Sequence, residues 1–432
     1  MKNKTEVIVV GGGPAGIAAA ITVARAGKKV VLIERGSFSG SKNVFGGAIY
    51  VQPTKEIFPD FEQTAPLERK TVSHRYVLNT KDKNISIGYE AREEESVTSY
   101  SVIRSKFDRW MAKEAQKEGV VLVTETLVTE LILKENKVVG VKTELEEYFA
   151  DIVILADGVN SLLAKQIGLR KEIKPKDVAL GVKEVIKLGK EKIDERFNLN
   201  DGEGCIYEFV GGPMLGMLGL GYVYTNKETI SIGIGVGLDE LVKRRLKPYE
   251  LLEQIKAHPS FKPLVKGGEL VEYSAHLIPE GGYKKMPKLY THGVMVIGDS
   301  AMLVNNIHWE GTNLAMISGK FAGETAIVAL DKNDFSTNTL SLYQKKLENS
   351  FVIKDLKTYK DVIDIVHHRT ESFLGYYLNK ITEFFGMFTS VDSIPKRKKY
   401  HAFIKSIFTD RSLSELFKDA WSFIRIFFGV LK

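Results

Sequence analysis

Short apolar runs alternate with amphipathic segments along the chain. Uninterrupted apolar runs, which are typical of strands buried on both faces of a parallel sheet, occur at residues 7–10, 30–33, 151–156 and 293–299. Residues 15–26 are small and helical, and a second helix is predicted at residues 313–330. A helix is also predicted at 106–118, and it precedes predicted hairpin strands at 120–123, 127–133 and 138–143. This alternation predicts an α/β fold whose parallel sheet is assembled from separated parts of the chain.

The middle of the chain follows a different, β-rich pattern. Strands are predicted at residues 178–188, 205–210, 215–224 and 230–236. Residues 53–100 are strand-like and polar, and residues 248–258 predict a single amphipathic helix. Beyond about residue 335 the chain is predicted to be helical to its end. We therefore predict that a second, sheet-based domain interrupts the first and that a helical region follows both.

The most informative motif lies in residues 5–34, TEVIVVGGGPAGIAAAITVARAGKKVVLIE. Gly11 permits a tight turn, Gly13 lets the backbone approach a pyrophosphate, and Gly16 lets the helix pack on the strand. Glu34 ends the second strand, where a carboxylate can accept both ribose hydroxyls. Its negative charge also disfavours a 2′-phosphate. The segment therefore predicts dinucleotide binding and argues against NADP.

Two later strand ends extend this motif. Residues 156–158 (Ala-Asp-Gly) form a strand end with a tight turn that can run over a pyrophosphate, although an ordinary turn is the alternative. Residues 298–300 (Gly-Asp-Ser) place an acid where it can hydrogen-bond a ribityl hydroxyl. In this order the three motifs are the pattern of the glutathione-reductase-type FAD-binding fold. NAD enzymes lack the last element, so the sequence predicts FAD.

Two predicted helix starts provide further candidates. Arg104 and Asp108 stand at i and i+4, either as a surface ion pair or with the arginine near the diphosphate. Residues 311–313 (Gly-Thr-Asn) precede a helix whose N-terminal N–H groups could stabilise the anion that develops on a reduced flavin. The alternative for this segment is a simple N-cap. Val128 is expected to lie near the adenine and to contribute backbone contacts only.

Composition narrows the possible partners and compartments. The chain has 432 residues, 44% hydrophobic and 27% charged, which is typical of an ordinary folded protein. A net charge of +7 without a concentrated basic segment makes nucleic acid a poor default partner. Cys205 is the only cysteine, so the chain cannot bind an iron–sulfur cluster by itself. No signal peptide and no apolar run of membrane-spanning length is present, and we expect a protein of the cytoplasmic side.

Several segments resemble the FixC branch of the electron-transfer-flavoprotein–quinone oxidoreductase (ETF-QO) family. The matching segments are residues 39–43 (SGSKN), 46–47 (GG), 181–186 (GVKEVI), 222–227 (YVYTNK), 278–282 (IPEGG) and 311–319 (GTNLAMISG). They extend over nearly the whole chain in the expected order. Long ETF-QO members carry a ferredoxin-like domain whose cysteines bind a [4Fe–4S] cluster, and this chain lacks those cysteines. It is therefore similar to the short form, in which a separate subunit supplies the cluster.

The resemblance implies an FAD subunit that takes electrons from an ETF-like FixA/FixB pair and passes them to a membrane quinone. A small ferredoxin-like FixX subunit would be a further partner, and some such assemblies bifurcate electrons from NADH. The implied domains are an FAD-binding domain (residues 1–70, 100–175 and 290–335), a β-rich quinone/substrate domain (71–99 and 176–289) and a helical C-terminal region (336–432). Candidate quinone-site segments are residues 211–212, 219–224 and 279–282, where glycines at strand bends are the alternative.

The chemistry is expected to be centred on the flavin, without a catalytic side chain or a metal ligand. His276 and His308 lie near these motifs and are candidates for a proton relay, although a lone histidine is more often structural. The candidate FAD-binding residues are Gly11, Gly13, Pro14, Ala15, Gly16, Glu34, Arg35, Ser41, Lys42, Asn43, Gly46, Gly47, Arg104, Val128, Ala156, Asp157, Gly158, Gly298, Asp299, Gly311, Thr312 and Asn313.

The C-terminal segment raises the question of membrane contact. Apolar residues recur at helical spacing over residues 413–431, which predicts an amphipathic helix. Such a helix could pack on the body, contact a membrane as a monotopic element or bind the ferredoxin-like subunit. The basic residues 396–399 could contact anionic lipid.

Three other functions are compatible with the same sequence pattern. A geranylgeranyl-lipid reductase shares the fold, but its P-x-x-Y-x-W-x-F-P motif is absent. An aromatic hydroxylase and a non-catalytic FAD scaffold are the remaining alternatives.

Overall fold

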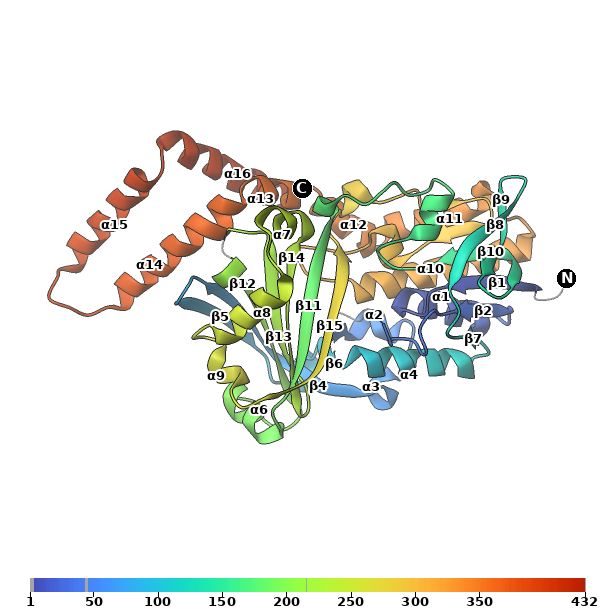
Figure 1. Cartoon of the computed structure of the whole chain (residues 1–432), viewed down its shortest axis with the longest axis horizontal. Coiled ribbons are helices and arrows are strands. Elements are labelled where there is room, and N and C mark those ends of the chain that lie inside the picture. Colours follow the sequence, from blue (N-terminus) through green and yellow to red (C-terminus); the bar gives the residue numbers. More distant parts are fainter. Residues whose placement is uncertain (1–3, 43–45, 215, 432) are drawn as a thin grey trace.

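Two β-sheets form the framework of the chain, and the computed structural model describes residues 4–42, 46–214 and 216–431 (Figure 1). The first sheet has the strand order β16-β17-β10-β1-β2-β7, and β8 and β9 extend it as an antiparallel hairpin beside β10. Its strands are β1 (Lys4–Val10), β2 (Val30–Ile33), β7 (Val121–Val123), β8 (Val128–Lys134), β9 (Lys137–Thr143), β10 (Glu147–Leu155), β16 (Tyr290–Thr291) and β17 (Val294–Val296). Strands β2, β1, β10 and β17 run parallel, so the predicted nucleotide-binding sheet is confirmed.

Small residues allow two helices to pack closely on this sheet. Helix α1 (Pro14–Arg25) lies against α10 (Thr312–Lys332). A Cβ atom on Gly319 would lie 2.1 Å from the carbonyl oxygen of Ala15, so only glycine permits this approach. Helix α4 (Arg104–Lys117) packs beside α1 and begins two residues before the predicted 106–118. The N-terminal ends of α1, α4 and α10 are thereby fixed relative to the sheet.

The second sheet has the order β15-β11-β14-β13-β12-β4-β6-β3, with β5 paired to β4. Its strands are β3 (Ala48–Tyr50), β4 (Leu67–Asn79), β5 (Asn84–Glu90), β6 (Ser99–Val102), β11 (Val178–Lys187), β12 (Glu203–Gly211), β13 (Gly219–Thr225), β14 (Thr229–Gly237) and β15 (Glu269–Pro279). Strand β3 and all but the first residue of β6 lie within ranges that are predicted for the FAD-binding domain. They join the second sheet because β6 pairs with β4 and β3 with β6.

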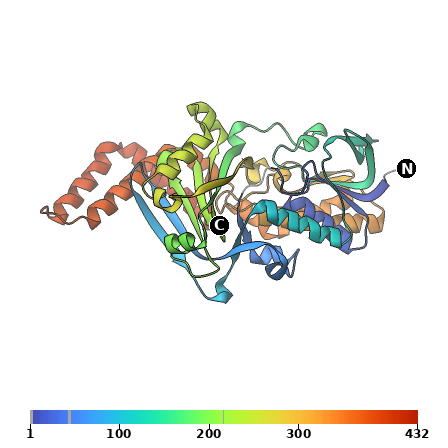
Figure 2. The same cartoon turned by 60° about the horizontal axis from the view of Figure 1, so that its bottom comes forward.

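Helices cover one face of the second sheet, and its other face is turned toward the first domain (Figure 2). Between these helices and the second sheet, buried residues such as Phe209 and Ile232 form a hydrophobic core that is separate from the core of the first domain. The short helices are α2 (Val51–Lys55), α3 (Phe61–Thr64), α5 (Leu162–Gln166), α6 (Lys190–Phe197), α7 (Leu238–Arg244), α8 (Pro248–Ala257) and α9 (Lys262–Val265). Strand β15 was not predicted from the sequence, whereas strands were predicted at the positions of β11, β12, β13 and β14.

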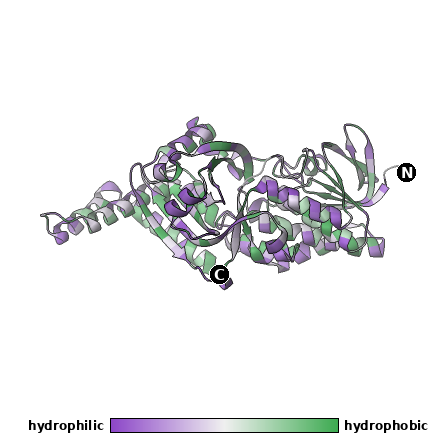
Figure 3. Cartoon of the chain, turned by 90° about the horizontal axis from the view of Figure 1, so that it is seen from below, coloured by the Kyte–Doolittle hydropathy of each residue, from purple (hydrophilic) through white to green (hydrophobic). Residues whose placement is uncertain are grey.

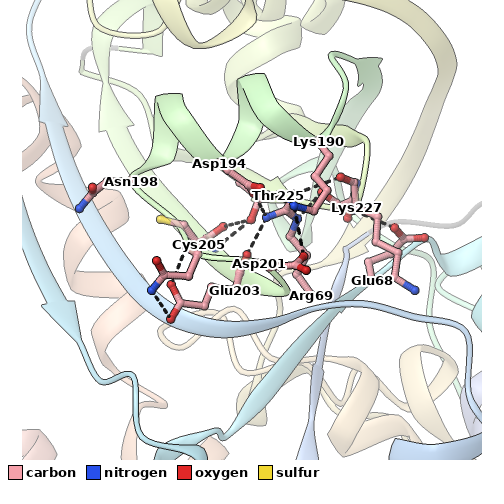
Figure 4. A network of polar contacts seen from close by, with 12 residues as sticks. Glu68, Arg69, Lys190, Asp194, Asn198, Asp201, Glu203, Cys205, Thr225 and Lys227 are labelled. Carbon is pink, nitrogen blue, oxygen red and sulfur yellow. Dashed lines mark hydrogen bonds and ion pairs between the residues drawn. The ribbon is translucent and has the colours of Figure 1, made fainter.

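Arg69 joins four elements of the second domain in a buried polar network (Figure 4). Its guanidinium donates to the carboxylate of Asp194 at 2.5 Å and to the backbone carbonyls of Asn226, Lys227 and Glu203. Arg92 pairs with the carboxylate of Glu203 at the edge of the same network. Because a buried arginine requires partners for its donors, this network fixes β4 against β12, α6 and the β13–β14 turn.

The C-terminal region is helical, as predicted, and part of it projects from the body (Figures 1 and 2). Its helices are α11 (Thr337–Asn349), α12 (Phe351–Thr358), α13 (Val362–His368), a π-helical segment (Ser372–Tyr377), α14 (Leu378–Thr389), α15 (Lys396–Asp410) and α16 (Leu413–Leu431). Helices α14 and α15 form the projecting arm. None of the helices in the described part of the chain is both long and apolar enough to cross a membrane.

Helix α16 is amphipathic, but its polar side is the buried one. Asp419 is completely buried, whereas Phe417 is 73% exposed and Trp421 is 56% exposed. The Asp419 carboxylate lies 3.3 Å from Arg411 and accepts a hydrogen bond from the Tyr377 hydroxyl at 3.1 Å. Figure 3 shows hydrophobic strands at the centre of both domains, with hydrophobic and hydrophilic residues alternating along the arm. The helix therefore packs on the body through the Asp419 contacts and through the Phe423 ring, whose centre lies 4.4 Å from that of the Phe373 ring, and leaves much of its apolar side exposed.

Candidate functional site

A cavity of about 600 Å³ lies between the first sheet and the uncovered face of the second. It adjoins the carboxyl ends of β1, β2, β10 and β17, where Val10, Ile33, Ala156 and Ile297 contribute to its lining. Ligands of open parallel sheets bind at this edge, beyond the carboxyl ends of the strands. The cavity continues to the second sheet, so one space is shared by both domains.

The glycine turn after β1 shapes the first part of the cavity. Gly11 has a φ of +107°, and a Cβ atom there would lie 2.2 Å from the carbonyl oxygen of Ala156. A Cβ atom on Gly16 would lie 1.9 Å from the oxygen of Gly11, so Gly16 permits the helix to pack on the turn. Gly13 differs, because a Cβ atom there would meet nothing within 4 Å and Gly13 lines the cavity. The backbone at Gly13 is therefore open to a ligand at the start of α1.

The carboxylate of Glu34 is held in place by two backbone N–H groups. One oxygen accepts from Gly12 at 2.7 Å, and the other accepts from Gly36 at 2.6 Å. Glu34 lines the cavity at the end of β2, where the motif predicts that it contacts a ribose. This contact stays a prediction, and the two backbone bonds show how the acid is oriented for it.

Arg104 connects the starts of two helices at the cavity. Its guanidinium makes a bidentate contact with Asp108 at 2.8 and 3.0 Å and donates to the Thr312 hydroxyl at 3.2 Å. Burial opposes the charge of Arg104, but the carboxylates of Asp108 and, more weakly, Asp299 outweigh burial and raise its pKa. The pair is thus buried rather than a surface ion pair, and the arginine side chain lies along the cavity wall.

Asp157 and Asp299 follow β10 and β17 and both line the cavity. Asp157 accepts hydrogen bonds from the Ser300 hydroxyl at 2.9 Å and from the backbone N–H of Leu163 at 3.3 Å. Burial raises the pKa of Asp157, and the Ser300 bond partly opposes that shift. These bonds tie the two strand-end loops together. Asp299 faces His276 on β15, with Oδ2 and Nε2 3.9 Å apart.

The structure brings most of the candidate FAD-binding residues to the cavity. Those in its lining are Gly11, Gly13, Pro14, Ala15, Glu34, Arg35, Lys42, Gly46, Gly47, Arg104, Val128, Ala156, Asp157, Gly158, Asp299, Gly311 and Thr312. Gly16, Ser41, Gly298 and Asn313 lie behind this lining. A Cβ atom on Gly298 would lie 2.8 Å from Cβ of Ala15, so this glycine serves packing. Asn43 lies outside the described residues.

The cavity suits FAD because of its shape and because its wall contains buried polar atoms that have no hydrogen-bond partner in the described part of the protein. Both side-chain polar atoms of Asn306 are buried without a partner and line the cavity. Such atoms require a hydrogen-bonding ligand or water. Together with the open backbone at Gly13, the acid at Glu34 and the start of α10, they form a cradle for an elongated dinucleotide. When bound, FAD would supply two-electron redox chemistry.

The second sheet closes the far part of the cavity with aromatic and acidic side chains. Tyr222 and Tyr224 are stacked with ring centres 4.4 Å apart, and Ile206 and Glu208 lie on the adjacent strand. These positions alternate along β12 and β13, as expected for side chains on one face of a sheet. Within the predicted quinone segments, residues 220, 222, 224 and 280 line the cavity.

Other residues that are predicted for the quinone site or for a proton relay do not line the cavity. Gly211 and Gly212 are outside the lining, and a Cβ atom on Gly211 would lie 2.1 Å from the carbonyl oxygen of Asn79. These glycines serve a close backbone contact. His308 also lies outside the lining and contacts the Tyr359 hydroxyl at 2.8 Å.

Several lining residues were not found from the sequence, among them Tyr50, Glu208, Asn306 and Trp309. The only signal for Glu208 was its alternation with Ile206 along a predicted strand. Glu280, within the predicted segment 279–282, also lines the cavity, and burial raises its pKa from 4.5 to about 8.

The described residues contain no group of three or more His, Cys, Asp and Glu side chains that could hold a metal ion. The single cysteine, Cys205, is buried in the second core, and burial raises the pKa of its thiol to about 11. A thiol of this kind is mostly protonated and hence unreactive at neutral pH.

Comparison with known proteins gives consistent matches over the whole chain. Residues 6–166 match the FAD-dependent oxidoreductase family, residues 178–278 the ETF-QO ubiquinone-binding family, and residues 363–428 the ETF-QO/FixC C-terminal domain family. The chain is 43% identical to protein FixC of Bradyrhizobium diazoefficiens, over 98% of this chain and 99% of that protein. It is 42% identical to protein FixC of Azotobacter vinelandii over the same shares of the two chains.

A solved structure supports the fold. A geranylgeranyl bacteriochlorophyll reductase-like protein from Thermoplasma acidophilum superposes with a TM-score of 0.73, over 96% of this chain and 98% of that one. The two sequences are 22% identical, so this likeness concerns the fold alone.

Proposed function

The chain belongs to the ETF-QO/FixC family and is an FAD-dependent oxidoreductase with a ubiquinone-binding domain, and we propose that it passes electrons from an electron-transfer flavoprotein to a membrane quinone. The observation that carries this proposal is the single cavity between the two sheets. Its first part is lined by the glycine turn, Glu34 and Asp299, and its far part by Tyr222, Tyr224 and other residues of the second sheet.

A shared cavity suits electron transfer between FAD and a second flat, apolar molecule. Ligand pockets of this kind are mostly apolar, with a few placed polar groups. The FAD would be held by the backbone at Gly13, by Glu34 and by Arg104, and the chain would set its orientation and exclude water. The quinone head group would lie against the tyrosines of β13.

We propose that the electron donor is an ETF-like FixA/FixB pair and that a small ferredoxin-like FixX subunit completes the assembly. The family membership supports the pair, and the lone buried Cys205 supports a separate iron–sulfur subunit. The assembly would operate as an NADH-dependent bifurcating complex, with half of the electrons going to quinone. The bifurcating flavin would lie in the ETF partner.

Anaerobic stopped-flow spectroscopy on the FAD-loaded protein tests the proposal. A reduced ETF-like partner should reduce the bound FAD, and a short-chain quinone should reoxidise it. Rapid reduction by NADPH alone would contradict the proposal, because it would indicate a reductase or hydroxylase. Reduced FAD that persists in the presence of quinone would contradict it as well.

A pair of matched variants locates the quinone in the cavity. Leu220 lines the far part of the cavity, and Leu220→Trp should fill it and slow reoxidation by quinone by about tenfold or more, since the added ring occupies the site. Leu133 is exposed on β8, away from the cavity, and Leu133→Trp should leave the rate unchanged. Equal rates in the two variants would place the quinone elsewhere.

We also propose that the C-terminal arm and α16 bind the membrane surface as a monotopic element. Exposed large apolar side chains gather on these helices: Phe384, Phe385, Phe388, Val391, Ile394, Ile404, Phe408, Leu413, Phe417, Trp421, Phe423, Ile424, Phe427, Phe428 and Leu431. Surfaces of this kind mark protein or membrane contacts. Since the buried side of α16 is charged, its apolar side is available to lipid.

The basic segment 396–399 contributes less charge to lipid than its sequence suggests. Lys396 donates to the last carbonyls of α14, and Lys399 pairs with Asp392. Arg397 and Lys398 are the basic residues of this segment with neither a carboxylate nor a carbonyl partner among the described residues. Apolar contact should therefore dominate, and binding should fall only modestly with added salt.

Liposome flotation checks the membrane proposal. Phe417→Gln with Trp421→Gln should reduce binding to vesicles, because two large rings leave the apolar side of α16. Val242→Gln, at an exposed apolar residue on α7, is the matched control and should bind like the parent protein. If vesicle binding is unchanged and binding of the ferredoxin-like subunit is lost instead, the exposed side of α16 is a protein interface.

A further inference from the structure

A histidine–glutamate pair connects the far part of the cavity with solvent. Glu208 on β12 lines the cavity, and its side chain is 10% exposed. His74 on the neighbouring strand β4 places Nε2 2.9 Å from Oε2 of Glu208, and its side chain is 30% exposed. This is an ion-pair distance, although the ring N–H is not aligned with the contact. The imidazole stacks on Tyr76, with ring centres 5.2 Å apart.

The other titratable groups around Glu208 keep their protons at neutral pH. The Glu208–His74 pair is therefore the part of the cavity wall that can exchange protons. Tyr50 on β3, Tyr76 on β4 and Tyr224 on β13 face it. The pKa of each tyrosine is raised, first by burial and then by neighbouring acidic or phenolic groups, Glu208 among them. These phenols therefore keep their protons at neutral pH and act as hydrogen-bond donors. Histidine, in contrast, is the side chain that ordinarily exchanges protons near neutral pH.

Other acids of the cavity stand apart from this position. Glu280 follows β15, and three strands, β11, β14 and β13, separate β15 from β12 in the sheet. Asp299 and His276 face each other in the part of the cavity near β15. Glu310 does not line the cavity, although its charge raises the pKa of Tyr50 as that of Glu208 does. It precedes α10 and accepts a hydrogen bond from the Asn313 amide, and burial raises its pKa. Of these two acid–histidine contacts, the one between Glu208 and His74 is the closer, at 2.9 Å against 3.9 Å, and its histidine is the more exposed, at 30% against 17%.

Quinone reduction needs such a contact, because a quinol has two more protons than a quinone. A quinone that takes two electrons and one proton from reduced FAD (FADH⁻) requires one further proton to become the quinol. We propose that Glu208 donates this proton to a quinone carbonyl oxygen and that His74 returns a proton from solvent to Glu208. The inference rests on the proposed function, since it assumes that the quinone lies in this cavity.

The proton balance closes over one turnover. A proton received from Nε2 of His74 passes from the Glu208 side chain to the quinone oxygen, where a C=O group becomes C–OH. His74 then takes a proton from water. Both side chains return to their starting states, so no further reactant is required. Glu208 would act as a general acid, and His74 would return a proton to Glu208 in each turnover.

Reoxidation of the photoreduced, FAD-loaded protein by two different acceptors tests the proposal. Ubiquinone-1 accepts electrons and protons, whereas ferricyanide accepts electrons only. Glu208→Gln should slow reoxidation by ubiquinone-1 about 100-fold or more, within the usual range for loss of a general acid, and should leave the ferricyanide rate unchanged. Equilibrium binding of the oxidised quinone should also be retained, because glutamine keeps the shape of the site.

Two further variants separate proton delivery from structural effects. His74→Ala should slow the ubiquinone-1 reaction and leave the ferricyanide rate unchanged, and added imidazole should restore the ubiquinone-1 rate. Glu90→Gln is the matched control, since Glu90 lies on the adjacent strand β5, pairs with Arg75 and does not line the cavity. It should react like the parent protein with both acceptors.

Each alternative outcome is distinct. If Glu208→Gln reacts with ubiquinone-1 at the parental rate, the proton-donor role is wrong. It is also wrong if the reoxidation rates with ubiquinone-1 and ferricyanide fall equally, or if the affinity for quinone falls by the same factor as the rate. If imidazole does not rescue His74→Ala, the relay through His74 is wrong. If the parent protein itself does not react with ubiquinone-1, the proposed function fails, independently of Glu208.

Discussion

The buried charge of Asp419 should hold α16 on the body of the protein. Asp419 is completely buried, contacts Arg411 at 3.3 Å and Arg369 at 3.7 Å, and accepts a hydrogen bond from Tyr377. Asp419→Asn keeps the size of the side chain and removes its charge. We expect this change to release α16 and leave both sheets folded.

The contacts determine the size of the effect. Breaking a buried ion pair by changing one partner costs about 3–5 kcal/mol. Here both arginines keep Glu415 as a second partner, at 2.8 and 3.5 Å, and their side chains are 23% and 16% exposed. The cost should therefore be about 2–3 kcal/mol, after allowance for these remaining contacts. At 1.4 kcal/mol per factor of ten, local opening of α16 should increase about 30- to 150-fold.

Hydrogen exchange measured by mass spectrometry checks this prediction. Peptides from residues 413–431 should lose protection in Asp419→Asn, and peptides from β1 and β14 should not. Asp410→Asn is the matched control, because Asp410 pairs with Lys380 at an exposed site at the end of α15. Unchanged protection of α16 in Asp419→Asn would refute the reasoning. Equal loss of protection in α16 and in both sheets would refute it too, since the anchor would then be part of the global fold.

Three other predictions concern the cradle, the polar network and pH. Gly13→Ala should fold normally and bind FAD more weakly by titration, because its methyl group enters only the cavity, whereas Gly16→Ala should reduce the yield of folded protein. Arg69→Met should lower the free energy of unfolding in urea by about 3 kcal/mol or more, and Lys190→Met, at an exposed residue of the same network, should change it little. The pKa of Glu280 is raised from 4.5 to about 8, so the FAD-free protein should lose stability as pH rises from 4.5 to 8, by at most about 1.4 kcal/mol per unit. Glu280→Gln should flatten this dependence in urea titrations at several pH values, and an unchanged slope would contradict the assignment.

The sequence was sufficient where chemistry depends on residues close together in the chain. The turn at Gly11, the open backbone at Gly13 and the acid at Glu34 lie within one strand–helix–strand unit, so their spacing alone predicted the cradle. The buried parallel strands were equally clear, because burial on both faces requires uninterrupted apolar runs. Boundaries between the domains were less clear, since β3 and β6 join the second sheet through pairing that leaves no local signal.

Two features were decided only by the tertiary structure. Glu208 meets His74 across 134 residues because β12 pairs in parallel with β4, and sheet register cannot be read from either strand alone. The amphipathic pattern of residues 413–431 predicted a helix, but it did not determine which side would be buried. Asp419 is buried because Arg369, which follows α13, and Arg411, which lies just before α16, provide its partners. The sequence thus determined the local cradle for the cofactor, whereas long-range pairing of strands and charges placed the acid in the cavity and exposed the apolar side of α16.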